Sequence, residues 1–208
     1  MFIIGADIGQ AANPTALAVL ETAPGDNQVR HLERLPLGTS YPAVVRRIGR
    51  LTMTLPGAAL VVDATGVGRP VVDQLRDAGL DPIAVTITAG KKTVCNGGAW
   101  RVPKKELVRS LAVALECGRL RVASRIPDAA ALKRELAAFT ATIGDCGHTR
   151  FAGRGEHDDL VVAVALAVWW ADAADWRAET ASNVVTLHAG KMGNRGSTSP
   201  RRRCQTTR

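Results

Sequence analysis

Two apolar segments that each end in an aspartate constrain this chain most strongly. Residues 1–6 are apolar and lead into Asp7 and Gly9, and residues 59–62 lead into Asp63 and a glycine-bearing turn. Short apolar segments bounded by turn residues are typical of buried strands. Ligands of open α/β sheets bind outside the carboxyl ends of the strands, which is where both acids would lie. We therefore expect an α/β fold with a site at its strand ends.

The spacing of apolar residues and turns predicts a mixed sheet flanked by helices. Strands over 15–21 and 28–37 follow the first strand and predict three antiparallel strands. A helix over 41–53 comes next, after which strand 59–63, helix 68–78 and strand 82–88 alternate, which indicates parallel pairing. The later elements are expected to be a loop over 89–102, a helix over 103–116, a strand over 120–123, a helix over 127–142, a hairpin over 143–152 and a helix over 157–176.

The charge of the chain is unevenly distributed. The 208 residues include 27 Lys and Arg and 19 Asp and Glu, a formal charge of +8, which favours polyanionic partners. Residues 180–208 hold six of the cations and no acid, so residues 1–179 carry 21 cations and 19 acids. We expect a folded domain over 1–178 and a disordered basic tail over 179–208.

Cysteine and hydropathy patterns exclude several classes of protein. The four cysteines (Cys95, Cys117, Cys146 and Cys204) form no CxxC pair, so neither a zinc site nor a secreted disulfide scaffold is indicated. The longest apolar run, residues 160–171, is too short to cross a bilayer, and the N-terminus lacks the features of a signal peptide. These patterns predict a cytoplasmic protein without a membrane partner.

A third acidic position, Asp158 and Asp159, opens the apolar segment at 160–171. Each acidic position alone also has a purely structural interpretation, as a turn residue or a helix cap. Together with Asp7 and Asp63, however, the pair predicts a carboxylate cluster without an evident cationic partner, and such a cluster favours divalent cations. Paired Mg²⁺ or Mn²⁺ ions in such a site catalyse phosphodiester hydrolysis.

The motifs that carry these acids resemble a known family. They are a Gly-x-Asp-x-Gly strand with a following Pro-Thr-Ala hairpin (5–16), the segment VVDATGVG (61–68) and the segment HDDLVVAVALA (157–167). In order and spacing they resemble the nuclease domain of phage terminase large subunits, of the ribonuclease H and Holliday-junction resolvase superfamily. The resemblance covers about residues 1–175 and includes the segment VPKKELV (102–108). It implies a ribonuclease H-like mixed sheet.

The resemblance also implies roles for particular residues. Asp7 would bridge two Mg²⁺ or Mn²⁺ ions, Asp63 would bind from the neighbouring parallel strand, and Asp159 with Asp158 would complete the site. His157 would lie behind these ligands, or simply be exposed at the start of the helix. Many relatives place a further acid one helical turn after the aspartate pair, and here that residue is Val162. This difference leaves the second ion with fewer expected ligands and gives more weight to Asp158.

A cluster of cations predicts contacts with double-stranded DNA. No acid lies between Asp81 and Glu106, and five cations do: Lys91, Lys92, Arg101, Lys104 and Lys105. They are suited to binding backbone phosphates, although an ordinary solvated loop would have the same composition. Few aromatic residues lie near these cations, Trp100 being the exception, so stacking on single-stranded bases is not favoured. The basic tail would add DNA affinity, bind another terminase or portal component, or serve only solubility.

The function expected from these features is a two-metal-ion endodeoxyribonuclease that cuts concatemeric DNA during phage genome packaging in the cytoplasm of an infected or lysogenic bacterium. The segment at 88–93 departs from a nucleotide-binding P-loop, so no nucleotide is expected in this chain. Two alternatives share the fold: a Holliday-junction resolvase and a catalytically inactive DNA-binding or assembly module. Actin-like ATPases and sugar kinases open with a similar strand but require two such domains.

Overall fold

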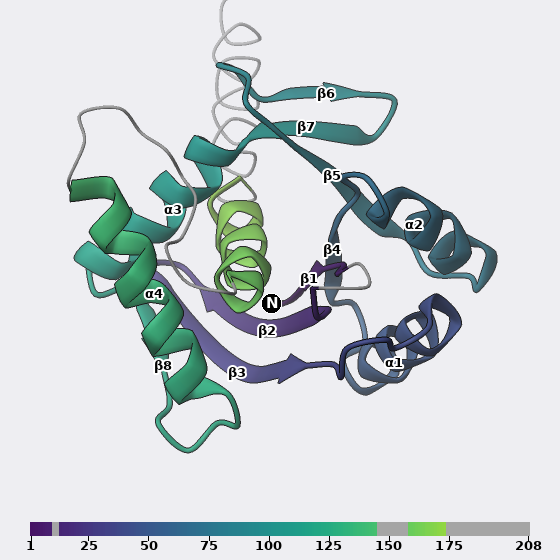
Figure 1. Ribbon diagram of the computed structural model, residues 1–208, viewed down its shortest axis with the longest axis horizontal. Helices are drawn as coiled ribbons and strands as arrows, with labels where there is room; N and C mark the ends of the chain where they lie inside the picture. Colours follow the sequence, from purple (N-terminus) through teal and green to yellow (C-terminus); the bar gives the residue numbers. More distant parts are fainter. Residues whose placement is uncertain (10–12, 145–157, 174–208) are drawn as a thin grey trace, which may run out of the picture. The chain divides into compact units, whose positions relative to one another are not determined.

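A mixed sheet of eight strands, in the order β6-β7-β5-β4-β1-β2-β3-β8, forms the framework of the protein (Figure 1). The computed structural model describes residues 1–9, 13–144 and 158–173, without the side chains of residues 139–144. The strands are β1 (Phe2–Asp7), β2 (Ala16–Ala23), β3 (Asp26–Arg34), β4 (Ala59–Asp63), β5 (Pro82–Thr88), β6 (Val94–Asn96), β7 (Ala99–Pro103) and β8 (Leu120–Val122). Strands β1, β2 and β3 pair antiparallel, whereas β1, β4, β5 and β7 run parallel. This arrangement confirms the predicted mixed sheet.

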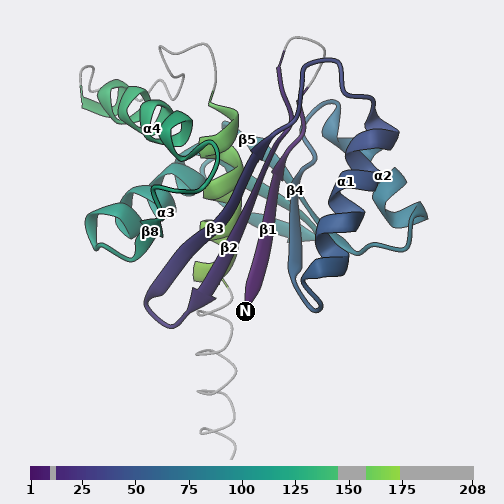
Figure 2. The same ribbon diagram turned by 90° about the horizontal axis from the view of Figure 1, so that it is seen from below.

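Helices cover both faces of the sheet (Figures 1 and 2). Helices α1 (Tyr41–Thr54) and α2 (Gly68–Asp77) pack on one face. Helices α3 (Lys104–Glu116) and α4 (Ala129–Gly144), together with a helix over residues 159–173, pack on the other. Because side chains of a strand alternate between faces, Ile3 of β1 contributes to one core and Ile4 to the other. In the described part of the chain, no helix is long and apolar enough to cross a membrane.

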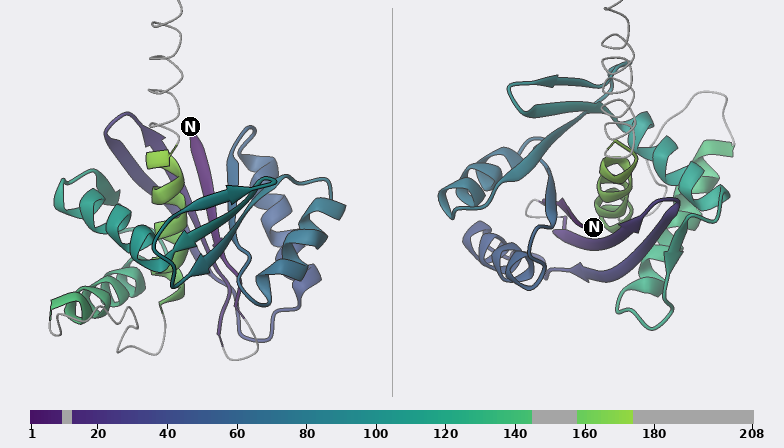
Figure 3. Two further views of the ribbon diagram at one scale, coloured as in Figure 1. Left: turned by 90° about the horizontal axis from the view of Figure 1, so that it is seen from above. Right: turned by 180° about the vertical axis from the view of Figure 1, so that it is seen from behind.

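The 159–173 helix is central to the second of these cores, and it approaches β1 closely (Figure 3). Every residue from 160 to 169 is buried, which explains why this segment lacks the polar face of an ordinary surface helix. The helix passes so close to β1 that a Cβ atom on Gly5 would lie 2.0 Å from the carbonyl oxygen of Ala163. A glycine at this position therefore permits the contact that brings the helix start towards the strand ends.

The structure corrects the prediction of a loop over residues 89–102. Strands β6 and β7 form a hairpin there, and β7 also pairs with β5 in parallel. The two residues between the strands, Gly97 and Gly98, have φ values of 56° and 80°, which is the conformation that a two-residue hairpin turn requires. Strand β3 was also predicted too long, because it ends at Arg34, before Pro36. The predictions for residues 145–152, His157 and the basic tail lie outside the described residues.

Three tryptophans join β7 to the 159–173 helix. The ring of Trp100 lies 5.6 Å from that of Trp169 and 5.9 Å from that of Trp170, both in edge-to-face geometry. The two helix tryptophans are themselves 5.9 Å apart. Since Trp100 packs into this cluster, its ring contributes to the fold.

Candidate functional site

Asp7 and Asp63 lie side by side at the carboxyl ends of β1 and β4. These strands are parallel neighbours, and the residues just before the two acids, Ala6 and Val62, are paired. The Asp63 carboxylate accepts a hydrogen bond of 2.8 Å from the backbone N–H of Thr65. A Cβ atom on Gly68 would lie 1.9 Å from the Asp63 carbonyl oxygen, so the turn needs glycine there. The backbone of this turn therefore positions the Asp63 carboxylate.

Asp158 and Asp159 reach the same place from the start of the 159–173 helix. The Asp158 carbonyl accepts the first helical hydrogen bond, 2.9 Å from the N–H of Val162. All four acids line one pocket of about 270 Å³, together with backbone and side chains from the two strand-end turns. The structure therefore brings together the four acidic residues that the sequence singled out, from two strands and one helix.

Burial raises the pKa of two of these carboxylates. The pKa of Asp7 lies well above its usual value, first because the group is removed from water and then because Asp63, Asp158 and Asp159 repel its negative charge. Burial also raises the pKa of Asp63, although hydrogen bonds from Thr65 and attraction to Lys104 oppose the rise. The pocket therefore favours positive charge.

Two cations supply part of that charge, contrary to the expectation of a cluster without cationic partners. The Nε of Arg34 lies 2.6 Å from an Asp159 oxygen, and the Nζ of Lys104 lies 3.1 Å from an Asp158 oxygen. Arg34 is the last residue of β3 and stands 125 positions from its partner. The expectation was wrong because such a pairing depends on the sheet order and leaves no local pattern.

Glu135 of α4 completes this arrangement and was not predicted. Its carboxylate accepts hydrogen bonds from the backbone N–H groups of Leu160 and Val161, at 3.1 and 3.2 Å, and it also pairs with Arg34. Burial and the nearby Asp159 raise its pKa. Glu135 lies three residues after Leu132, a core residue, and therefore on the buried face of the same helix. An acid at such a position was the sequence signal that could have identified Glu135. Glu135 and Arg34 together fix the helix start.

The donor chemistry of the pocket fits a hard divalent cation, whose preferred ligands are carboxylate oxygens. Within residues 1–9, 13–144 and 158–173, however, no group of three or more His, Cys, Asp or Glu side chains is arranged to hold a metal ion as it stands. Lys104 and Arg34 occupy carboxylate oxygens of the pocket. The residues therefore fit such an ion by type and by location, with side chains that must turn towards it.

The cations predicted to bind DNA lie in two different environments. Lys91, Lys92, Arg101 and Lys105 are exposed, on the β5–β6 connection, β7 and the first turn of α3. Lys104 is only 33% exposed and pairs with Asp158, so it belongs to the carboxylate pocket. The prediction grouped it with the solvated cations because it is adjacent to them in sequence.

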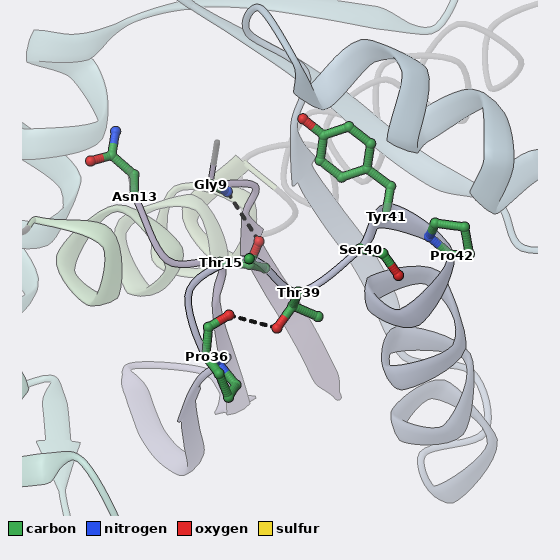
Figure 4. Close-up of a pocket in the computed structure, with 9 residues that line it drawn as sticks. Gly9, Asn13, Thr15, Pro36, Thr39, Ser40, Tyr41 and Pro42 are labelled. Atoms are coloured by element: carbon green, nitrogen blue, oxygen red, sulfur yellow. Dashed lines mark hydrogen bonds between the residues drawn. The ribbon is translucent and has the colours of Figure 1, made fainter. Parts of the chain in front are cut away.

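A second pocket, of about 440 Å³, shares the lining residues Gly9 and Asn13 with the first. The Gly9 N–H donates a 3.1 Å hydrogen bond to the Thr15 hydroxyl, which ties the end of β1 to the start of β2 (Figure 4). A Cβ atom on Gly9 would lie 2.1 Å from the Asn13 carbonyl oxygen. The residues that line this second pocket are uncharged and include Thr39, Ser40 and Tyr41.

An eight-stranded mixed sheet with helices on both faces and acids at its strand ends defines a ribonuclease H-like α/β fold. Within that class, the chain is similar to phage large-terminase nucleases. The nuclease of thermophilic phage G20c is 27% identical, with a TM-score of 0.57 and coverage of 80% of each chain. Its magnesium-bound structure is 28% identical, with a TM-score of 0.60 and coverage of 81% of this chain and 80% of that one.

The large terminase of a second thermophilic bacteriophage has the same fold, with 12% identity and a TM-score of 0.60. The match covers 80% of this chain but 38% of that longer protein. No protein-family model and no curated protein matches the sequence. The resemblance to terminase nuclease domains is thus confirmed by the solved structures.

Proposed function

We propose that this chain is a metal-dependent DNA endonuclease and forms the nuclease part of a phage terminase large subunit. The observation that carries the proposal is the convergence of Asp7, Asp63, Asp158 and Asp159 on one pocket, at the strand ends of a fold shared with terminase nucleases. Concatemeric DNA is the substrate in this proposal, and cleavage accompanies genome packaging in the bacterial cytoplasm. The remaining terminase subunits and the portal are the expected partners.

The four aspartates are the residues that would hold two Mg²⁺ or Mn²⁺ ions. G20c nuclease structures with bound magnesium, cobalt or zinc support the use of a divalent ion. Such ions activate water as a nucleophile and stabilise the leaving oxygen of a phosphodiester. The chain itself positions the carboxylates: Gly5 admits the helix, Thr65 orients Asp63, and Arg34 with Glu135 holds Asp159.

The exposed cations would hold the DNA near this pocket. Lys91, Lys92 and Arg101 belong to the hairpin region, and Lys105 lies on the first turn of α3. Contacts with backbone phosphates carry no sequence information, so we expect cleavage with little sequence preference. His157 would support the ligands from behind in this proposal.

Cleavage of supercoiled plasmid in EDTA, Mg²⁺ or Mn²⁺ tests the proposal. We expect nicking and linearisation only with metal, and a loss of at least about 100-fold in Asp63→Asn, because the amide retains the Thr65 hydrogen bond but supplies no negative charge. Asp81→Asn, at an exposed aspartate just before β5, is the matched control and should cut at the wild-type rate. Equal activity of wild type and Asp63→Asn would indicate a contaminating nuclease.

The ion pairs of the pocket favour one alternative, an inactive DNA-binding or assembly module. Arg34 and Lys104 already neutralise two of the four carboxylates. Val162 stands where the family resemblance implies a further acid. Metal-independent DNA binding without cleavage in either metal would support this alternative. Parallel reactions with a four-way junction distinguish a resolvase from the terminase nuclease and from the inactive module. A resolvase would cut the junction in preference to the plasmid.

A further inference from the structure

Lys104 occupies a position at the carboxylate pocket that its neighbours in sequence do not share. It begins α3 directly after β7, whose carboxyl end lies at the same edge of the sheet as the ends of β1 and β4. Its Nζ atom lies 3.1 Å from Asp158, and the side chains are 33% and 38% exposed. The pair is therefore open to solvent and to a ligand of the pocket.

The aliphatic part of the Lys104 side chain packs against the helix that carries the aspartate pair. Together with Leu107, Val161 and Val162, it lines a small apolar pocket between α3 and the 159–173 helix. This packing fixes where the ammonium group lies. The positive charge also lowers the pKa values of Asp7 and Asp63, against the effect of burial, so it acts on both strand-end carboxylates.

Stability alone is a poor explanation for a lysine in this place. An ion pair with this degree of exposure contributes little to stability. Lys104 thus places a partly exposed positive charge at the edge of this acidic pocket, where the phosphate group of a substrate can reach it.

We propose that Lys104 is a catalytic residue of this site and that its ammonium group contacts a non-bridging oxygen of the phosphate that is cleaved. The proposal rests on the proposed nuclease function. One Asp158 oxygen cannot serve Lys104 and a metal ion equally well, so Lys104 competes with metal in the absence of DNA. If Asp158 were to hold an ion, the ammonium group would turn towards the phosphate, where it would stabilise the negative charge that develops during hydrolysis.

The proposal predicts opposite effects of Lys104→Gln on metal binding and on cleavage. Calorimetric titration with Mn²⁺ in the absence of DNA should show about two- to fivefold tighter binding, because a competing cation is removed. The single-turnover cleavage rate at saturating Mn²⁺ should fall about 100-fold, and Lys104→Arg should restore part of it. A residue with a merely structural role would weaken both properties.

Two matched lysine variants serve as controls. Lys133→Gln, at an exposed position of α4, should leave both the Mn²⁺ affinity and the cleavage rate unchanged. Lys105→Gln, at the next residue of α3, should leave the Mn²⁺ affinity unchanged while weakening DNA binding. Thermal unfolding of each variant verifies that it is folded.

Three results would overturn the proposal. Unchanged Mn²⁺ affinity in Lys104→Gln would place the ammonium group away from the carboxylates, and tighter Mn²⁺ binding with undiminished cleavage would make Lys104 a competitor only. If the wild type does not cleave, the nuclease function fails separately. The phosphate contact is then tested by duplex binding in Mn²⁺, where Lys104→Gln should bind more weakly than Lys133→Gln, and equal binding would refute it.

Discussion

The fold places the Asp7 carboxyl group where its negative charge is unfavourable. Removal from water and repulsion by three other aspartates raise its pKa, so the folded state retains this proton to a higher pH than the unfolded state does. A carboxyl group whose pKa is raised in the folded state contributes its full stabilisation at pH values below the pKa that it has in the unfolded state, which is near 4. That contribution is lost as the pH rises through the raised pKa. Without metal, Asp7 therefore makes the protein less stable at neutral pH than in mild acid.

Asp7→Asn should remove this pH dependence. In EDTA at pH 7 to 8 we expect a higher melting temperature than in wild type, because the amide carries no charge, and little difference at pH 4. Mn²⁺ should raise the melting temperature of wild type but not of Asp7→Asn. Thermal unfolding between pH 4 and 8 with and without Mn²⁺ measures both effects. The control is Asp81→Asn, and if it matched Asp7→Asn in EDTA the effect would not come from the pocket.

The acidic residues of the pocket could be predicted from sequence, whereas their partners could not. Asp7 and Asp63 end apolar strands, and parallel strands bring such ends together. Arg34 and Glu135 contact the helix start only because β3 and α4 lie where they do in the folded protein. Their roles depend on contacts between residues 25 to 125 positions apart, which no local pattern encodes.

At the scale of elements, the contact between β1 and the 159–173 helix determines the geometry of the pocket. Asp7 belongs to the strand and Asp158 and Asp159 to the helix, so their separation depends on how closely the two pack. Gly5 lies at the closest approach, facing Ala163. A side chain at position 5 would act on the pocket although it lies inside the sheet.

Gly5→Ala should therefore affect both stability and metal binding. The new Cβ atom would meet the Ala163 carbonyl oxygen, and we expect a loss of about 2 to 3 kcal/mol in the free energy of unfolding. Mn²⁺ affinity should fall as the helix start moves away from Asp7. Gly49→Ala is the control, because nothing lies within 4 Å of a Cβ atom there, and in helix α1 it should stabilise by about 0.5 to 1 kcal/mol. Chemical denaturation and Mn²⁺ titration provide the two measurements, and wild-type values for Gly5→Ala would contradict the close packing.

The hairpin of β6 and β7 was the element that sequence reasoning missed. Glycine and cation content suggested a loop, but two adjacent glycines between short segments that contain Val94 and Trp100 are also the pattern of a tight hairpin. The prediction of a loop relied on the glycine and lysine content of the segment and disregarded the position of the two glycines between its apolar residues. The helices were predicted more accurately because their apolar periodicity extends over longer segments.

At the scale of the whole molecule, negative and positive charges are concentrated in different parts of the chain, and we expect one part to carry the chemistry and the other to bind DNA in general. The pocket concentrates negative charge, whereas the excess of positive charge lies in residues 180–208. These two features should respond differently to salt. Binding through many cations releases counterions from DNA and weakens steeply with salt, while the chemistry in the pocket depends on the metal.

Replacing Arg201, Arg202 and Arg203 together with glutamine should weaken DNA binding without slowing cleavage of saturating DNA. The logarithmic dependence of affinity on salt should become shallower by up to about 3, since each lost phosphate contact contributes about 0.9. Fluorescence anisotropy with a labelled duplex at several salt concentrations measures this slope. An unchanged slope would assign DNA binding to the cations near the pocket, such as Lys91 and Lys92.

The contact among Trp100, Trp169 and Trp170 has an optical consequence. Indole chromophores whose centres lie less than 6 Å apart couple their electronic transitions, and coupled transitions give paired circular dichroism bands of opposite sign. Trp100 belongs to β7, and the other two rings belong to the helix that begins at the aspartate pair. A shift of this helix against β7 would change the intensity of those bands. The protein therefore contains its own spectroscopic reporter of the helix position, which ultraviolet light can detect without an attached dye.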